Sequence, residues 1–173
     1  MKLLVWIGVS MGAALSLAAS SPGHSQSEIA PAIDYDQAVS LDSEDLAEQG
    51  MKEAYDRLAP SLVALGVSPE PISEAVDSVA PTYKVTFRGQ TVDLWQTPSE
   101  GLSWCRAGRV FFEIVNAQLK PGLRFYALNN GNDLHGIFLT DADYARAMTE
   151  IDKKTDRPFI PTEEPEWCGQ PHD

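Results

Sequence analysis

The sequence contains few of the residues on which most catalytic and metal sites depend. It has three histidines and two cysteines among 173 residues. A catalytic zinc site takes three protein ligands, and after the leader the chain offers only His135, His172 and two cysteines that we expect to bind each other. Residues 129–140, NNGNDLHGIFLT, lack the sixth-position glycine and twelfth-position glutamate of a calcium-binding EF-hand loop. No GxSxG motif of a serine hydrolase occurs after the leader. We therefore expect no metal and no cofactor.

Basic residues are also scarce. The chain has 13 Lys and Arg against 25 Asp and Glu, which gives a formal net charge of −12. Nucleic-acid affinity comes largely from Lys and Arg that neutralise phosphates, and an excess of carboxylates repels phosphate backbones and anionic lipid. The charge therefore excludes nucleic acid as a partner and allows a cationic one. The simpler alternative is that the charge only keeps an exported domain in solution.

The first residues resemble a secretory signal peptide. Lys2 precedes an uncharged, mostly apolar run over residues 3–19, which is followed by Ser, Pro and Gly. The run is short for a membrane span, which needs about 20 apolar residues. We predict cleavage before Gln26, which makes residues 1–25 a signal peptide and the mature protein periplasmic or secreted and free of the membrane. The alternative is that residues 3–19 remain as an anchor.

The two cysteines, Cys105 and Cys168, predict a disulfide, because exported proteins meet oxidising compartments. The bond would tie the proline-rich C-terminal tail to the body of the domain. A competing hypothesis makes Cys105 a thiol nucleophile near a helix start, with His135 as its base and Asp133 or Asn132 orienting the imidazole. That arrangement would make the protein a small periplasmic hydrolase.

Apolar residues spaced three and four apart predict helices. The first begins at Asp42 or Ser43 and is stopped or kinked at Pro60. Gly66 fits the left-handed position after a helix end, and a second helix is expected from Ser68, with a strand over residues 62–67 as the alternative. The remaining two helices are expected over residues 99–119, with Cys105 on the buried side, and over residues 140–154. The apolar face expected on the second helix comprises Ile72, Ala75, Val76 and Val79.

Period-two alternation predicts two hairpins. Residues 82–95 fold around a turn at Arg88 and Gly89, which places Val85 opposite Val92 and Lys84 opposite Asp93. Residues 123–140 fold around a type I′ turn at Asn130-Gly131, which places Tyr126 opposite His135 and Leu128 opposite Asp133. Residues 159–161 suit a short edge strand. The predicted fold is α+β, a small antiparallel sheet of two β-hairpins packed against helices in the order α-α-β-β-α-β-β-α. Residues 26–41 are a flexible lead and residues 42–173 a single domain.

Candidate binding residues fall in two places. Asn129, Asn132, Asp133 and His135 surround the second hairpin turn, where either turn geometry accounts for them or they line a small polar pocket. Trp95 and Trp104 flank a loop and either are exposed, which suits contact with a protein or a sugar, or plug the ends of the core. The sequence favours an exported binding protein over an enzyme: an accessory, inhibitor or immunity-type protein that contacts a protein partner in the periplasm.

Overall fold

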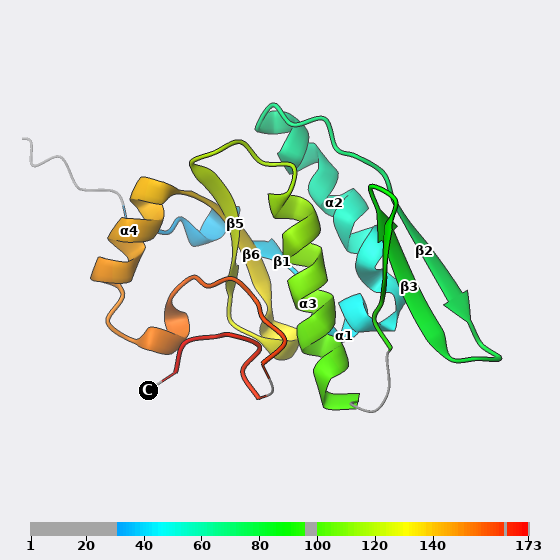
Figure 1. Ribbon diagram of the computed structural model, residues 1–173. Coiled ribbons are helices and arrows are strands. Elements are labelled where there is room, and N and C mark those ends of the chain that lie inside the picture. The colour runs from blue at the N-terminus through cyan, green and yellow to red at the C-terminus, as the bar shows by residue number, and fades with distance from the viewer. Residues whose placement is uncertain (1–30, 96–99, 165, 173) are drawn as a thin grey trace, which may run out of the picture. The chain divides into compact units, whose positions relative to one another are not determined.

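Two three-stranded antiparallel sheets lie on either side of the helix α3, Glu100–Asn116 (Figure 1). The computed structural model describes residues 31–95, 100–164 and 166–172, so the predicted signal peptide, residues 1–25, lies outside the described residues. The α+β class and the predicted succession of helices and strands are confirmed, with two additional strands, β1 and β2. Each predicted hairpin belongs to its own sheet, rather than both to one.

The first predicted hairpin forms as expected. Strands β3, Thr82–Phe87, and β4, Gln90–Asp93, pair with Val85 opposite Val92 and Lys84 opposite Asp93. Arg88 and Gly89 between them have φ values of 50° and 77°, the two left-handed residues that a type I′ turn requires. The turn residues and the cross-strand pairs specify the same register, which is why the sequence was sufficient to predict this hairpin.

The helix expected from Ser68 is wrong, because the segment forms β2, Ile72–Asp77, at the edge of the same sheet. Of its predicted apolar face only Ile72 is buried: Ala75 is exposed, Val76 is 44% exposed, and Val79, in the following turn, is 94% exposed. The prolines at 69 and 71 disfavour helical backbone at the residues before them. Pairing along the whole length of β3 then fixes the extended conformation.

The second sheet has the strand order β1-β6-β5. Strands β5, Leu123–Leu128, and β6, His135–Thr140, pair with Leu128 opposite His135, so the predicted register is wrong by two residues. The turn is longer than predicted, because Asn130 is extended and caps a short 3-10 helix, Gly131–Asp133. A shift of two keeps every side chain on its predicted face. The predicted edge strand is present as a bridge between Phe159 and Ala127 of β5.

The described part of the predicted flexible lead belongs to the fold. Strand β1, Val39–Ser40, pairs with β6, and a short 3-10 helix, Tyr35–Gln37, precedes it. Ala32, Ile33 and Leu41 are buried. Weak patterning therefore did not mean disorder, because a strand this short cannot show a period.

The first predicted helix is divided. Asp42 caps α1, Ser43–Asp45, and a kink within Leu46–Gly50 separates it from α2, Met51–Ala64. Gln49 has a φ of 76° at this kink. The predicted stop at Pro60 is wrong, because Pro60 lies inside α2. Gly66, with a φ of 74°, has the left-handed backbone predicted for it just past the helix end.

One apolar core connects the sheets through α3. Phe111 and Phe112 of α3 are fully buried, and the Phe112 ring stacks on Phe125 of β5 with centroids 4.9 Å apart. Gly136 of β6 leaves room for the Phe125 ring, since a Cβ at residue 136 would lie 2.0 Å from its Cζ. Helix α4, Asp141–Glu150, is capped by Thr140 and ends four residues before the predicted end at residue 154. The same core includes Tyr83 and Val85 of β3.

Candidate functional site

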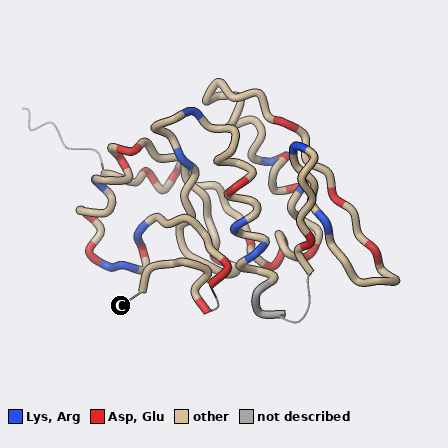
Figure 2. Tube along the Cα trace, in the orientation of Figure 1, with Lys and Arg blue, Asp and Glu red and all other residues tan. Residues whose placement is uncertain are grey.

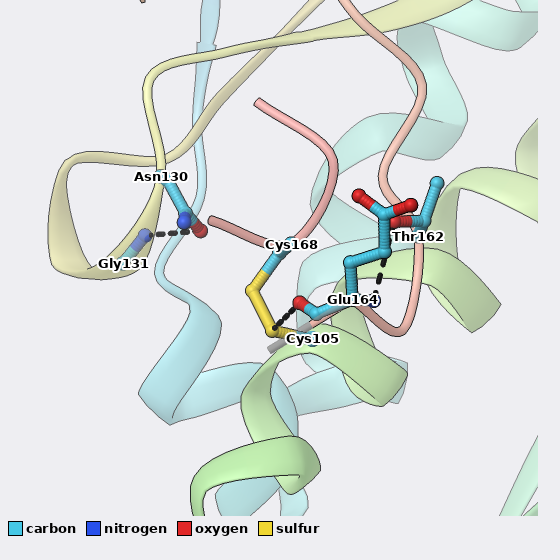
Figure 3. The surroundings of a disulfide bond; sticks show 6 residues. All are labelled: Cys105, Asn130, Gly131, Thr162, Glu164 and Cys168. Carbon is cyan, nitrogen blue, oxygen red and sulfur yellow. Dashed lines mark hydrogen bonds between the residues drawn. A yellow bond between two sulfur atoms is a disulfide. The ribbon is translucent and has the colours of Figure 1, made fainter. Parts of the chain in front are cut away.

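The disulfide between Cys105 and Cys168 is present, as predicted, and joins α3 to the tail (Figure 3). Both residues are buried, and the Cys105 sulfur contacts the Glu164 carbonyl oxygen at 3.4 Å. A sulfur in a disulfide is not a thiolate, so Cys105 cannot act as the nucleophile of the alternative hydrolase site in this form. Asp133 also does not orient the imidazole through its carboxylate, because its backbone carbonyl oxygen is what contacts Nδ1 of His135, at 2.8 Å.

The tail folds into a tight turn around Cys168. The Thr162 N–H donates to the Cys168 carbonyl at 2.8 Å, and the Cys168 N–H donates to the Glu164 carbonyl at 3.1 Å. Glu166, Cys168 and Gly169 all have positive φ values. These backbone hydrogen bonds and the disulfide hold the turn in place. They therefore also hold the backbone of Trp167, which lies within the turn directly before Cys168.

Trp104 and Trp167 are exposed beside this disulfide. Their exposed fractions are 40% and 42%, and each directly precedes one of the two bonded cysteines. The Cα atoms of the cysteines are 4.8 Å apart, so those of the tryptophans are at most about 12 Å apart. The Trp167 ring stacks on His172, with centroids 5.3 Å apart and planes at 20°. We call Trp104, Trp167 and His172 the tryptophan surface.

The tail that carries Trp167 also carries three acidic residues, Glu163, Glu164 and Glu166, and acidic positions are red in Figure 2. Glu163 is held by Arg106 at 3.4 Å and Arg109 at 2.7 Å. Burial acts to raise the pKa of Glu163, but the two guanidinium groups outweigh burial and hold that pKa below its usual value. Glu164 and Glu166 are exposed and have no basic partner among the described residues. This side of the surface therefore carries unpaired negative charge.

Trp95, for which the sequence left exposure and packing against the core open, is packed against the core. Its ring is half-buried against the core and lies 5.7 Å from the Tyr83 ring. Its indole N–H donates to the Ala47 carbonyl at 2.7 Å. The kink after α1 leaves that carbonyl without a helical partner, and Trp95 supplies one. Of the two candidate tryptophans Trp104 alone is exposed, and Trp167 is not among the candidate binding residues of the sequence analysis.

The four residues around the second hairpin turn are divided between a hollow and the turn itself. Asn129 and His135 line a hollow of about 440 Å³, which we call the polar hollow. Asn132 and Asp133 do not line it; the Asn132 amide instead donates to Glu44 at 3.3 Å. The other lining residues are Tyr35, Ala38, Leu128 and Asp156. Tyr35 and Asp156 are brought in from distant parts of the chain, and no local sequence signal marks them.

A further hollow, of about 280 Å³, separates α3 from the β3–β4 hairpin. Its floor is apolar, with Val85, Val110 and Ile114 buried. Arg88 lies at its edge, where its guanidinium binds Glu70 and donates to the Ala117 carbonyl at 3.2 Å. The charged group at this hollow is thus already paired within the protein.

The part of the chain that the structure describes contains neither a membrane-spanning helix nor a metal-binding cluster. It contains no helix with the length and apolar character to cross a membrane. In the same residues, no group of three or more His, Cys, Asp or Glu is placed to hold a metal ion. No family model, curated protein or solved structure matches this sequence, so its function has to be inferred from the arrangement of its own side chains.

Proposed function

We propose that the chain is an exported binding protein, of the accessory, inhibitor or immunity type, that contacts a protein partner through the tryptophan surface. The observation that carries the proposal is the pair of exposed tryptophans, Trp104 and Trp167, held at one disulfide. The disulfide is compatible with an oxidising compartment, and the leader-like first residues favour the periplasm or secretion.

The energy available from these two side chains is substantial. A tryptophan presents up to about 250 Å², so covering a side chain that is 40% exposed removes about 100 Å² from water. At about 25 cal/mol per Å², each ring would contribute on the order of 2.5 kcal/mol to binding. The turn that carries Trp167 is fixed by hydrogen bonds and by the disulfide, so little side-chain and loop entropy is lost when a partner binds.

The charge beside the rings favours a cationic partner segment. Glu164 and Glu166 are exposed without basic partners among the described residues. A Lys or Arg of the partner would meet these carboxylates and an aromatic face together, which is the setting of a cation–π contact. Rim charges of this kind mainly raise the association rate and set specificity.

The test uses the full exported chain, tagged and captured from the cell envelope. Wild type is compared with Trp104→Ala/Trp167→Ala and with Val63→Ala, a control that removes apolar surface from α2, where Val63 is 59% exposed. Circular dichroism checks that each variant is folded. We expect the partner to be recovered with wild type and with the Val63 variant, and to be lost with the tryptophan variant. Equal recovery with the tryptophan variant, or no partner under any growth condition, would contradict the proposal.

A further inference from the structure

The polar hollow presents hydrogen-bonding atoms that no other described residue of the protein binds. Tyr35 is 59% exposed, and neither its hydroxyl nor the Asn129 amide has a partner among the described residues. Asp156 accepts from Lys153 at 2.8 Å and Thr155 at 3.1 Å through Oδ1, and its Oδ2 has no protein partner in the described part of the chain. The hollow thus combines free donors with free acceptors.

The tautomer of His135 follows from its neighbour. Nδ1 of His135 lies 2.8 Å from the Asp133 carbonyl oxygen, and a carbonyl oxygen only accepts hydrogen bonds. The proton is therefore on Nδ1, and Nε2 of the neutral ring is an acceptor without a partner among the described residues. Because this contact fixes the ring, Nε2 has a defined direction.

Asp156 supplies the carboxylate among the residues that line the hollow, and Lys153, which does not line it, pairs with that carboxylate. The ammonium group of Lys153 holds the pKa of Asp156 below its usual value through their hydrogen bond, so Asp156 is ionised at neutral pH. The pair contributes one negative and one positive charge. An anionic ligand would meet the carboxylate, and a cationic ligand would compete with an ammonium group already in place. The hollow therefore suits an uncharged ligand.

We propose that the polar hollow binds a neutral, hydroxyl-rich ligand, a saccharide unit. Hydroxyl groups both donate and accept, which matches the acceptors of Asp156 and His135 and the mixed groups of Asn129 and Tyr35. The exposed Tyr35 ring offers an apolar face for the C–H side of a sugar ring. The volume of about 440 Å³ falls within the range of about 300–1,000 Å³ that is usual for small-ligand sites. Buried Leu128 and half-buried Ala38 supply the apolar part of the wall.

The site is separate in composition from the tryptophan surface, so the saccharide proposal does not rest on the proposed function. None of the residues that line the hollow belongs to the tryptophan surface. The Trp104→Ala/Trp167→Ala variant is therefore expected to bind saccharide like wild type. Loss of protein capture with saccharide binding intact would identify two independent sites.

The experiment is a titration of the ¹⁵N-labelled protein followed by amide chemical shifts. The probes are glucose, galactose and N-acetylglucosamine as free sugars, short soluble oligosaccharides of the same units, inorganic phosphate and ethylammonium. Asn129→Gly removes the amide and preserves the backbone, because Asn129 has a φ of 58°; Asp156→Asn removes the charge. The controls are Asn132→Ala, in the same turn, and Glu164→Gln, which removes an exposed carboxylate elsewhere, since neither residue lines the hollow.

We expect at least one sugar to give saturable shifts at Asn129, His135 and Asp156. Loss of one hydrogen bond of ordinary strength would weaken binding about fivefold in the Asn129 and Asp156 variants, with no change in the two controls. Tighter binding of an oligosaccharide than of its monosaccharide would point to a glycan chain, and equal binding to a free sugar. The proposal is overturned by the absence of saturable shifts with every sugar, by equal weakening in the controls, or by stronger binding of phosphate or ethylammonium.

Discussion

Breaking the disulfide should lower the stability of the protein by a large and calculable amount. The bond closes a loop with a sequence separation of 63 residues between Cys105 and Cys168. The chain-entropy relation then gives about 14 cal/mol/K of entropy regained by the unfolded chain, or about 4 kcal/mol at 25 °C. This is a large part of the stability of about 5–15 kcal/mol that is typical of a domain.

The same figure predicts a shift in melting temperature. The unfolding entropy of the unit formed by residues 31–173 is about 0.3 kcal/mol/K. A loss of about 4 kcal/mol therefore corresponds to a decrease of about 13 °C in Tm. The tail should also become mobile, because Trp167 would lose the bond that holds its turn against α3.

The assay compares thermal and urea unfolding of the exported protein with and without a reductant, and of the Cys105→Ala/Cys168→Ala variant. Reduction should lower the Tm of wild type and leave the Tm of the variant unchanged. The reasoning would be refuted if the Tm of reduced wild type and the Tm of the variant were both within about 3 °C of the Tm of oxidised wild type. That result would mean that closing the loop does not restrict the unfolded chain.

Three further predictions concern single side chains and are read from urea unfolding midpoints. Tyr83→Phe should cost about 1–3 kcal/mol, because the buried hydroxyl donates to Glu74 and accepts a backbone N–H; an unchanged midpoint would contradict this. Gly136→Ala should lower the free energy of unfolding by at least 2 kcal/mol, about the upper part of the range for overpacking. Gly108→Ala should be neutral or stabilising, because the atom nearest to a Cβ at residue 108 would be 3.8 Å away. Similar midpoints for the two variants would contradict this. Burial acts to raise the pKa of Glu163, but its two arginine partners lower this pKa in the folded state. The contribution of Glu163 to the free energy of unfolding is therefore present above the unfolded pKa of about 4.3 and is lost as pH falls through the folded value. Glu163→Gln should therefore flatten the decrease in stability between about pH 5 and pH 3, and an identical slope in wild type and variant would count against the pair.

Local signals were sufficient where they agreed with one another. At the β3–β4 hairpin, the turn residues Arg88 and Gly89, the apolar pair and the charge pair of Lys84 with Asp93 all specify one register. The β5–β6 register could not be fixed in this way, because a shift of two residues preserves both faces of a strand. In the observed register the Gly131 N–H donates to the Asn130 side chain at 2.7 Å, a contact that the sequence pattern does not report.

Long-range contacts explain why the sequence did not predict strand β2, the packing of Trp95 or the full lining of the polar hollow. Strand β2 has helical spacing, and its pairing with β3, together with the prolines at 69 and 71, makes it extended. Trp95 packs inside the fold because its indole N–H donates to the Ala47 carbonyl, which the kink after α1 leaves without a helical partner. The two residues are separated by 48 positions in the sequence, so no local pattern connects them. The polar hollow likewise depends on Tyr35 and Asp156, which meet Asn129 and His135 only after the chain has folded. Such convergence has no periodic signature in one sequence.

The position of α3 has a consequence for how the protein comes apart. The two sheets have no strand in common, and the residues of α3 share one apolar cluster with Val85 of β3 and Phe125 of β5. Unfolding of either sheet would remove the residues packed against one side of α3. It would also expose to solvent the aromatic side chains of α3 that pack against the other sheet. The sheets are thus thermodynamically linked although they exchange no hydrogen bonds, and hydrogen exchange in β3 and β5 should report the same opening free energy.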